Sequence, residues 1–489
     1  MRTFLPVVHV LGATIGLFAF SMLVPIAVAW SKGDPALGVY DFAFAVTFAA
    51  GAILYLATRR TGKQAERELQ ARDGFLLVSL VWIVLPAFAT LPLLLLLPEL
   101  SFTEAYFETV SGLTTTGATT LSGLDALPAA ILVWRSLLVW IGGMGILVLA
   151  VAIMPMLGIG GSQVFKAESP GPMKDTRLTP RIAGTAKGLY GVYLAISLCC
   201  VLALKWAGMS WLDAACHTGS IMGLGGFSTH DASFAFFDSV AIESVAVVFM
   251  TLAAINFATH FRAFRQASLS AYATCPETRW VVGVMGAAAL IVAFFLVRTG
   301  TYANFGTALR HALFNTVSIA TTTGFSSTDF GAWPAFAPVF MLFLSCFVSS
   351  SGSTGGGIKM IRAILMFKQT SREMVRILHP RVVNPLRLGS EVIDNKVIFS
   401  MLAFMLVYGG TIILLTIVLL FSGLDVVTAF TAVVACINNT GPGLNRVGPA
   451  STYAVLNDFQ TWVCIVAMVL GRLELFTVLV LFTPGFWRK

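Results

Sequence analysis

Four short segments of this sequence share a pattern of small and polar residues that could bind a cation. They read EAYFETVSGLTTTG (104–117), DAACHTGSIMGLGG (213–226), HALFNTVSIATTTG (311–324) and TAFTAVVACINNTG (428–441). Aligned without gaps, all four have alanine at the second position and glycine at the last, and the glycines are Gly117, Gly226, Gly324 and Gly441. Repetition at intervals of roughly 100 residues indicates one structural unit used four times.

The chemistry that this unit predicts is coordination of a dehydrated cation by backbone carbonyl oxygens. About ten residues of helix rise 15 Å, half the hydrocarbon thickness of a bilayer, so each segment is expected to be a re-entrant half-helix. Irregular backbone at that depth is tolerated where it lines a water-filled cavity. Four tips meeting on one axis would meet this condition, and carbonyl rings replace the hydration shell of K⁺. Gly, Ser and Thr are also common wherever membrane helices pack closely, but four segments in register favour a pore.

A second polar feature is a run of nine Ser, Gly or Thr residues at 349–357, followed by Lys359. It does not fit a phosphate-binding loop, because Lys359 does not directly follow Gly357 and no Ser or Thr follows the lysine. The 14 mostly apolar residues before it (335–348) are too few to cross a bilayer. Two interpretations stay open, a helix break required by packing and a movable loop inside the membrane.

A third feature is Arg472, which lies within the last apolar stretch of the chain. An arginine at that depth costs roughly 2.5–3.5 kcal/mol, so it is expected to have a function or a polar partner. The nearby Glu474 is offset by two residues and therefore does not share its helix face. A structural salt bridge to another repeat is one explanation.

Other chemistry finds little support in the sequence. The seven cysteines are scattered and the six histidines do not cluster, so no zinc site, disulfide framework or catalytic triad is indicated, and no enzyme activity or bound cofactor is expected. Acidic residues near the expected entrance are predicted only to raise the local cation concentration; they are Glu104, Glu108, Asp231 and Asp329.

The elements that must position these residues are membrane spans. The chain of 489 residues is 57% hydrophobic and only 11% charged, against about 25% charged residues in soluble domains. This excludes an ordinary soluble enzyme, a nucleic-acid-binding domain and a disordered chain. About ten spans are predicted, including two before the first repeat and the interrupted stretch 334–367. The predicted units are 1–73 (two N-terminal spans and a basic loop), 74–181, 182–278, 279–393 and 394–489 (pore repeats 1 to 4).

The Lys and Arg residues gather on alternate sides of these spans, in the segments 59–72, 166–187, 262–279, 359–396 and 488–489. The intervening loops are acidic instead. The positive-inside rule therefore places the basic loops and both termini in the cytoplasm. The net charge of +8 is explained by topology and not by an acidic partner such as nucleic acid.

Three parts of the chain together resemble a known family. The four repeated segments, SGSTGGGIKMIR (351–362) and GRLELFTVLVLFTPGFW (471–487) are similar to TrkH proteins, the membrane subunits of a bacterial potassium uptake system related to KtrB and the plant HKT transporters. The resemblance covers essentially the whole chain. It implies an all-α polytopic membrane protein of the bacterial inner membrane, with four span–pore-loop–span repeats around one pore. It also implies a homodimer, a pore in each subunit and gating by a cytosolic nucleotide-binding TrkA-like subunit.

The resemblance further implies which residues bind the ion and which control its passage. The K⁺ ligands would be the backbone carbonyls of Thr115, Thr116, Leu224, Gly225, Thr322, Thr323, Asn439 and Thr440. The loop that blocks the pore would comprise Gly352, Ser353, Thr354, Gly355, Gly356, Gly357 and Lys359, its glycines supplying flexibility. Arg472 would face the pore below the filter as an electrostatic barrier. Gly117 favours potassium, because a serine in the first repeat goes with sodium permeation in related transporters.

The expected function is potassium uptake through a channel-like pathway down the electrochemical gradient, with Rb⁺ as a substitute ion and assistance from the proton gradient left open. One alternative is a secondary transporter with alternating access that couples K⁺ to H⁺ or Na⁺, although such carriers often have inverted or twofold repeats. The other is a membrane sensor or scaffold that transports nothing.

Overall fold

The structure, a computed structural model, describes residues 4–64, 71–152, 182–388 and 391–488. These residues form an all-α fold, and the one sheet within them is a two-stranded antiparallel ribbon of β1 (Arg387–Leu388) and β2 (Glu391–Val392). Seven helices of the described chain are long and apolar enough to cross a membrane, or nine if two sharply bent helix pairs each count as one span. The boundaries of the five units predicted from the sequence remain predictions.

The N-terminal part is a helical hairpin. Its first arm joins α1 (Leu5–Ala19) to α2 (Leu23–Lys32) through a short 3₁₀ turn, and its second arm is α3 (Leu37–Gln64). The arms touch through glycines, since a Cβ on Gly51 would lie 2.8 Å from the carbonyl oxygen of Gly12. Small residues allow such close backbone approach between membrane helices.

Four units follow, and each contains a membrane helix, a short half-helix and a second membrane helix. Repeat 1 comprises α4 (Ala71–Ala89), α5 (Leu91–Leu96), α6 (Phe102–Leu113) and α7 (Ala129–Ala152). Repeat 2 comprises α9 (Ile182–Trp206), α10 (Trp211–Gly223), α11 (Val240–Ala254), α12 (Phe257–Gln266) and α13 (Ser270–Thr274). Repeat 3 comprises α14 (Pro276–Arg298), α15 (Phe305–Ala320), α16 (Phe336–Ser345) and α17 (Met360–Leu378). Repeat 4 comprises α18 (Asn395–Phe421), α19 (Val426–Ile437), α20 (Asp458–Arg472), α21 (Phe476–Leu479) and α22 (Pro484–Trp487).

The half-helices α6, α10, α15 and α19 begin at polar N-caps. Ser101, Ser210, Asn304 and Asp425 each accept a backbone N–H of the first turn through the side chain. Such caps satisfy amide groups that would otherwise lack a partner. At α19 the Thr428 N–H holds the pKa of Asp425 below its usual range, so this cap is a carboxylate at neutral pH.

The second membrane helix is broken in three of the four repeats. Between α11 and α12 the axis bends by 98°, and between α20 and the helical segment Phe476–Phe482 it bends by 105°. In repeat 3 the stretch 334–367 forms α16, an irregular loop and the first part of α17, which continues to Leu378. The glycine-rich run predicted this third break, whereas the breaks at Ile255–Asn256 and Leu473–Leu475 were missed.

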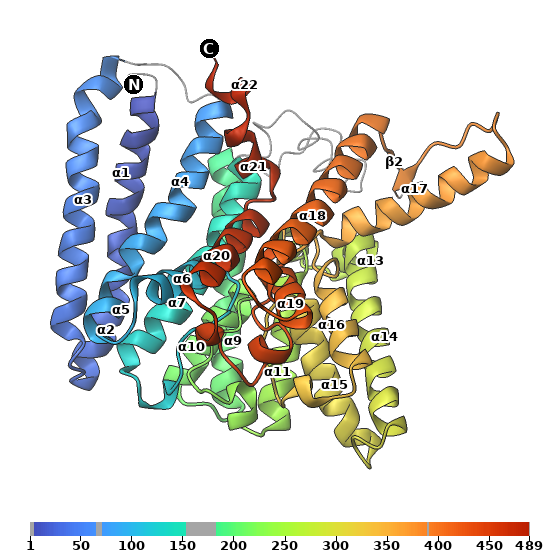
Figure 1. Ribbon diagram of the computed structural model, residues 1–489, viewed down its shortest axis with the longest axis horizontal. Helices are drawn as coiled ribbons and strands as arrows, with labels where there is room; N and C mark the ends of the chain where they lie inside the picture. The colour runs from blue at the N-terminus through green and yellow to red at the C-terminus, as the bar shows by residue number, and fades with distance from the viewer. Residues whose placement is uncertain (1–3, 65–70, 153–181, 389–390, 489) are drawn as a thin grey trace.

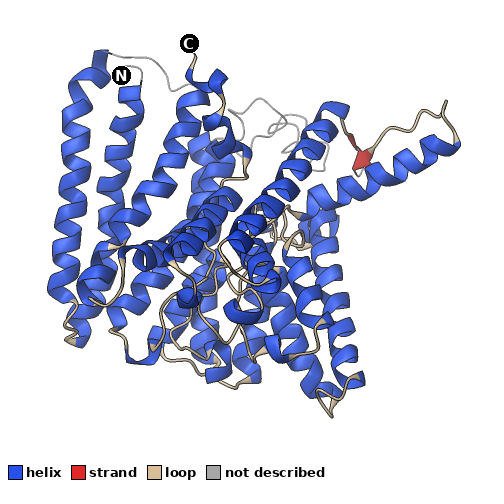
Figure 2. Cartoon of the chain, in the orientation of Figure 1, coloured by secondary structure: helices blue, strands red, loops and turns tan. Residues whose placement is uncertain are grey.

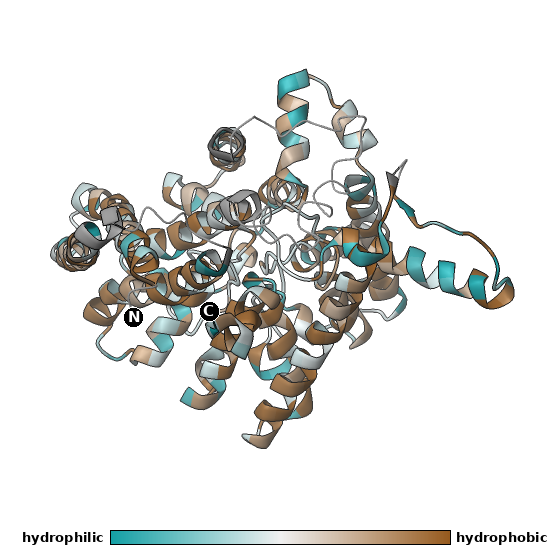
Figure 3. Ribbon diagram, turned by 90° about the horizontal axis from the view of Figure 1, so that it is seen from above, coloured by the Kyte–Doolittle hydropathy of each residue, from teal (hydrophilic) through white to brown (hydrophobic). Residues whose placement is uncertain are grey.

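Both described ends of the chain lie on the same face of the molecule, at the top of Figure 1. Figure 2 shows helices throughout the bundle, with tan loops gathered at its centre and lower face. Seen from above, brown apolar helices surround these central loops (Figure 3), and α17 runs out of the bundle as a largely hydrophilic arm. Large apolar side chains stay exposed on the long helices, such as Leu406 and Ile413 of α18, as expected for a surface that faces lipid. Most of the predicted basic segment 166–187 lies outside the described residues.

Candidate functional site

The chain turns back at the end of each half-helix by the same hydrogen bonds. The amide of the residue before the glycine donates to the carbonyl five residues earlier in all four repeats, with distances of 2.8–3.0 Å. The donors are Thr116, Gly225, Thr323 and Thr440, and the acceptors are Ser111, Ser220, Ser318 and Ala435. The residue before each donor has a positive φ; these are Thr115 (54°), Leu224 (55°), Thr322 (64°) and Asn439 (54°). The aligned segments are thus one structural motif, here called the tip.

The four tips touch one another in a closed ring. A Cβ on Gly117 would lie 2.6 Å from the amide nitrogen of Gly226, and one on Gly226 would lie 2.6 Å from the carbonyl oxygen of Thr323. A Cβ on Gly324 would clash with the carbonyl oxygen of Thr440. A Cβ on Gly441 would lie 2.8 Å from the carbonyl oxygen of Thr116, which closes the ring in the order 1–2–3–4–1. Glycine is therefore required here because neighbouring repeats approach one another closely. Its own backbone conformation is a further reason.

Four of the eight predicted carbonyl ligands contact a neighbouring tip in this ring. The carbonyl oxygens of Thr115, Thr116, Thr323 and Thr440 lie against the glycine-containing backbone of a neighbouring tip. The Thr323 carbonyl also accepts a hydrogen bond of 2.5 Å from the Gly226 amide. The Leu224 side chain is fully buried in an apolar cluster between repeats 2 and 3, so only its main chain is available to an ion.

Side chains behind the tips fix them in place. Asn439 Nδ2 donates to Thr116 Oγ1 at 2.9 Å and to the Met468 carbonyl at 3.0 Å, which joins repeat 4 to repeat 1. The hydroxyls of Ser220 and Ser318 donate to the carbonyls of Phe227 and Phe325, at 2.6 and 2.7 Å. These serines share one column of the alignment, and their function as a brace between the half-helix and the returning chain was not predicted.

The glycine-rich loop lies directly against the tips. The Gly356 amide donates to Thr322 Oγ1 at 2.9 Å, and Thr354 Oγ1 donates to the Met222 carbonyl at 2.9 Å. Ser349 Oγ donates to the Thr321 carbonyl at 3.3 Å. Ser353 and Thr354 are almost completely buried. The loop therefore packs directly against tip 3 and against the C-terminal end of α10.

The conformation and the close packing of this loop require glycine at several positions. Gly352 and Gly357 have positive φ values of 68° and 76°. A Cβ on Gly356 would clash with the Asn438 carbonyl, and one on Gly355 would clash with Ser349 Oγ. Lys359 also has a positive φ, of 79°, and its buried ammonium group donates to the Gly355 carbonyl.

Arg472 is buried and joins three parts of the molecule. Its guanidinium donates to the Thr354 carbonyl at 2.8 Å and to the Gly142 carbonyl of α7 at 3.0 Å. Among the described residues no carboxylate pairs with it, whereas Glu474 pairs with Arg362 at 2.6 Å. The salt bridge considered for Arg472 is thus replaced by two backbone acceptors, one of them in the loop.

The acidic residues expected near the entrance have structural partners. Glu108 is buried and forms an ion pair of 2.7 Å with Arg135 of α7. The other three accept backbone amides: Glu104 completes the capping box of α6, Asp231 accepts the Leu124 amide of repeat 1, and Asp329 accepts the Gly331 amide. Because Glu108 is buried and its charge is paired with Arg135, the ion pair does not support the prediction that Glu108 raises the local cation concentration.

Arg135 is a site residue that the sequence analysis missed. Besides Glu108 it donates to the Ser228 carbonyl at 3.0 Å, and its guanidinium lies 4.3 Å from the centre of the Phe227 ring. It therefore holds the chain that leaves tip 2 against repeat 1. Its position inside the apolar stretch 129–157 was the available signal, as it was for Arg472.

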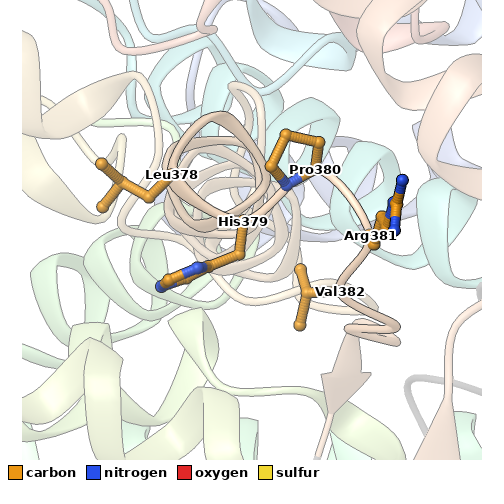
Figure 4. Close-up of a pocket in the computed structure, with 5 residues that line it drawn as sticks. All are labelled: Leu378, His379, Pro380, Arg381 and Val382. Atoms are coloured by element: carbon orange, nitrogen blue, oxygen red, sulfur yellow. The ribbon is translucent and has the colours of Figure 1, made fainter.

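The loops that follow the half-helices of repeats 1 and 2 are also joined by a side-chain hydrogen bond. His230 hydrogen-bonds Asp125, and its other ring nitrogen lies 3.5 Å from Asp213. The hydrogen bond from His230 holds the pKa of Asp125 below its usual range. A separate pocket is shown in Figure 4; it lies at the far end of α17, lined by Leu378, His379, Pro380, Arg381 and Val382, and is remote from the tips.

Comparisons with known proteins agree over almost the full length of the chain. A family model described as "TrkH: Cation transport protein" matches residues 41–489. The chain is 44% identical to the Trk system potassium uptake protein TrkH of Halomonas elongata, with 99% of both chains covered. It is 41% identical to the protein of the same name from Escherichia coli K12, covering 99% of this chain and 100% of that one. A crystal structure of the potassium transporter TrkH from Vibrio parahaemolyticus superposes with a TM-score of 0.90 at 41% identity, covering 99% and 100% of the two chains.

Proposed function

The chain belongs to the TrkH family of cation transport proteins, and from this premise we propose that it takes up K⁺ across the bacterial inner membrane through a channel-like pore. The family is one of transporters and not of enzymes, and its curated relatives are named potassium uptake proteins. The observation that carries the proposal is the closed ring of four tips, in which the glycine of each tip lies against backbone atoms of a neighbouring tip. Carbonyl rings of this kind replace the water shell of K⁺.

The filter would consist of the carbonyls leading into Gly117, Gly226, Gly324 and Gly441. The half-helices would assist it, because their C-terminal ends carry partial negative charge and all four end at the ring. The loop 352–357 with Lys359 would close the pathway beneath the filter, and its hydrogen bonds with Thr322 and Arg472 support this role. Arg472 would keep the loop closed by holding its Thr354 carbonyl and would add a positive barrier.

The remaining parts of the proposal concern assembly. A homodimer with a cytosolic nucleotide-binding subunit of the TrkA type would control the gate, with both termini in the cytoplasm. The arm α17, whose sequence includes Lys368, Arg372 and Arg376, lies in the upper part of the view, as the two described termini do (Figure 1). This distribution agrees with the positive-inside rule.

The test is ion flux through the purified protein. We expect ⁸⁶Rb⁺ uptake into liposomes that contain only this chain, driven by a K⁺ gradient, and discrete current steps in a planar bilayer. Uptake without current steps, together with strict dependence on a proton or sodium gradient, would favour the alternating-access carrier. If liposomes that contain the folded protein take up no ⁸⁶Rb⁺, with or without the regulatory subunit, the result would favour a sensor or scaffold.

A further inference from the structure

Glu277 stands out among the buried carboxylates because it contacts no filter residue and has no basic side chain within salt-bridge distance in the described chain. It is the second residue of α14, and its side chain is buried. Its Oε1 atom accepts two backbone amides, from Ser351 and Ile361, each at 3.0 Å. These amides lie on opposite sides of the glycine-rich loop.

The ends of the loop also meet each other at this point. The Ile358 amide donates to the Cys346 carbonyl at 2.6 Å, and the Met360 amide donates to the Ser349 carbonyl at 2.8 Å. Ser351 lies at the entry to the glycine run, and Ile361 lies in the first turn of α17. One carboxylate oxygen therefore fixes the distance between the start of the loop and the helix that leaves it.

A negative charge suits this position. A carboxylate accepts hydrogen bonds more strongly than a neutral amide oxygen does, and a buried charge needs compensation. The loop supplies it through the two backbone amides of Ser351 and Ile361. If the loop moved away, the buried Glu277 carboxylate would lose both of its amide donors.

We propose that Glu277 is a latch that holds the intramembrane loop in its closed position by clamping the two ends of the loop together. This inference rests on the proposed gating function of the loop. Glu277 is a positioning residue in this scheme, because it acts on permeation through the loop and touches neither the ion path nor the tips. Movement of the α12–α13–α14 connection, which leads directly into Glu277, would be one way to release the latch.

The experiment compares Glu277→Gln with the natural chain in ⁸⁶Rb⁺ flux from liposomes. Loss of the charge should raise basal flux by about tenfold, as expected for weakening charge-assisted hydrogen bonds in one state of a two-state gate. Glu277→Asp keeps the charge but shortens the reach, and should also raise flux. Glu373→Gln is the matched control, since it removes a carboxylate from the surface of α17 and should leave flux unchanged.

Two further measurements distinguish a failure of the latch from a failure of the gating function on which it rests. Ser353→Cys should react faster with a water-soluble thiol reagent when Glu277→Gln is present, because the released loop exposes residue 353. In a chain that lacks residues 353–356, Glu277→Gln should add no further flux. The latch would be overturned if Glu277→Gln raised flux equally in the deletion background. It would also be overturned if folded Glu277 variants left both flux and thiol reactivity unchanged. If the deletion itself leaves flux unchanged, the gating function fails, and thiol reactivity still decides whether Glu277 holds the loop.

Discussion

Single residues at the tips carry backbone strain. Thr115 and Thr322 are β-branched yet have φ values of 54° and 64°, where such residues are seldom found. Residues in such conformations cost of order 1–3 kcal/mol and persist only when their surroundings hold them. Here the surroundings are specific: the Thr322 hydroxyl accepts the Gly356 amide, and the Thr116 hydroxyl accepts Asn439 Nδ2. The strain is therefore localised in the ring that would contact the ion.

Gly324→Ser tests the ring at this scale. Gly324 has a φ of 91° and no room for a Cβ beside the Thr440 carbonyl, so serine should displace that carbonyl. We expect the K⁺/Na⁺ permeability ratio to fall by about tenfold, the equivalent of roughly 1.4 kcal/mol. Reversal potentials in bilayers measure it. Gly286→Ser on α14, where a Cβ meets nothing within 4 Å, is the control; an unchanged ratio in Gly324→Ser would contradict the carbonyl-ring filter.

At the scale of elements, the irregular loop is the most extensively bonded segment around the ring. It contacts tip 3 through Thr322, α10 through the Met222 carbonyl, α20 through Arg472 and α14 through Glu277. Buried backbone groups must find partners, and these elements provide them where the helix is broken. A loop held by several separate contacts can be released by weakening a few of them, which suits a gate.

Substitutions of Arg472 can separate the two functions proposed for it, a positive barrier and a hydrogen-bonded support of the loop. Arg472→Ala removes both the positive charge and the two carbonyl contacts, and should raise basal ⁸⁶Rb⁺ flux by about tenfold or more. Arg472→Lys keeps the charge but lacks the planar fork that reaches both carbonyls. If the contacts matter more than the charge, Arg472→Lys should also raise flux. Flux as low as in the natural chain would show that charge alone forms the barrier, and loss of folded protein in both variants would indicate a structural role.

At the scale of the whole molecule, the pathway depends on contacts between repeats that are far apart in the sequence. The ring closes only because tip 4 meets tip 1, although their glycines are separated by 324 positions. Apolar packing supports the same closure, since one core cluster combines residues of the N-terminal hairpin, repeat 1 and repeat 4.

The Asp125–His230 contact gives a prediction about pH. The pKa of Asp125 is held below its ordinary value of 3.8 by the hydrogen bond from His230, so this carboxylate stabilises the fold above pH 3.8 and stops doing so as the pH falls through its folded value. Asp125 is half exposed, so the contribution is less than about 1 kcal/mol. Asp125→Asn should lower the melting temperature in detergent by about 1–2 °C between pH 5 and 7.

The same difference should shrink below pH 3.8, because the natural chain then loses the charge as well. The exposed Asp41→Asn is the control, for which no such pattern is expected. A difference that grows on acidification would contradict the assigned direction of the pKa shift.

The sequence by itself determined the membrane class, the fourfold repeat and the positions of the tips, because these depend on local composition and on hydrogen bonds within about five residues. The same locality explains why the break at 349–357 could be predicted from its glycines. The breaks after Ala254 and Arg472 could not, because no glycine-rich run marks them and they are stabilised by partners elsewhere in the molecule. Arg472 and Glu277 bind carbonyls and amides 74 to 330 positions away, and the Arg135 guanidinium that pairs with Glu108 is 27 positions away. Only the tertiary structure decided those pairings, since a buried charge takes whichever polar group the packing of distant helices brings within reach.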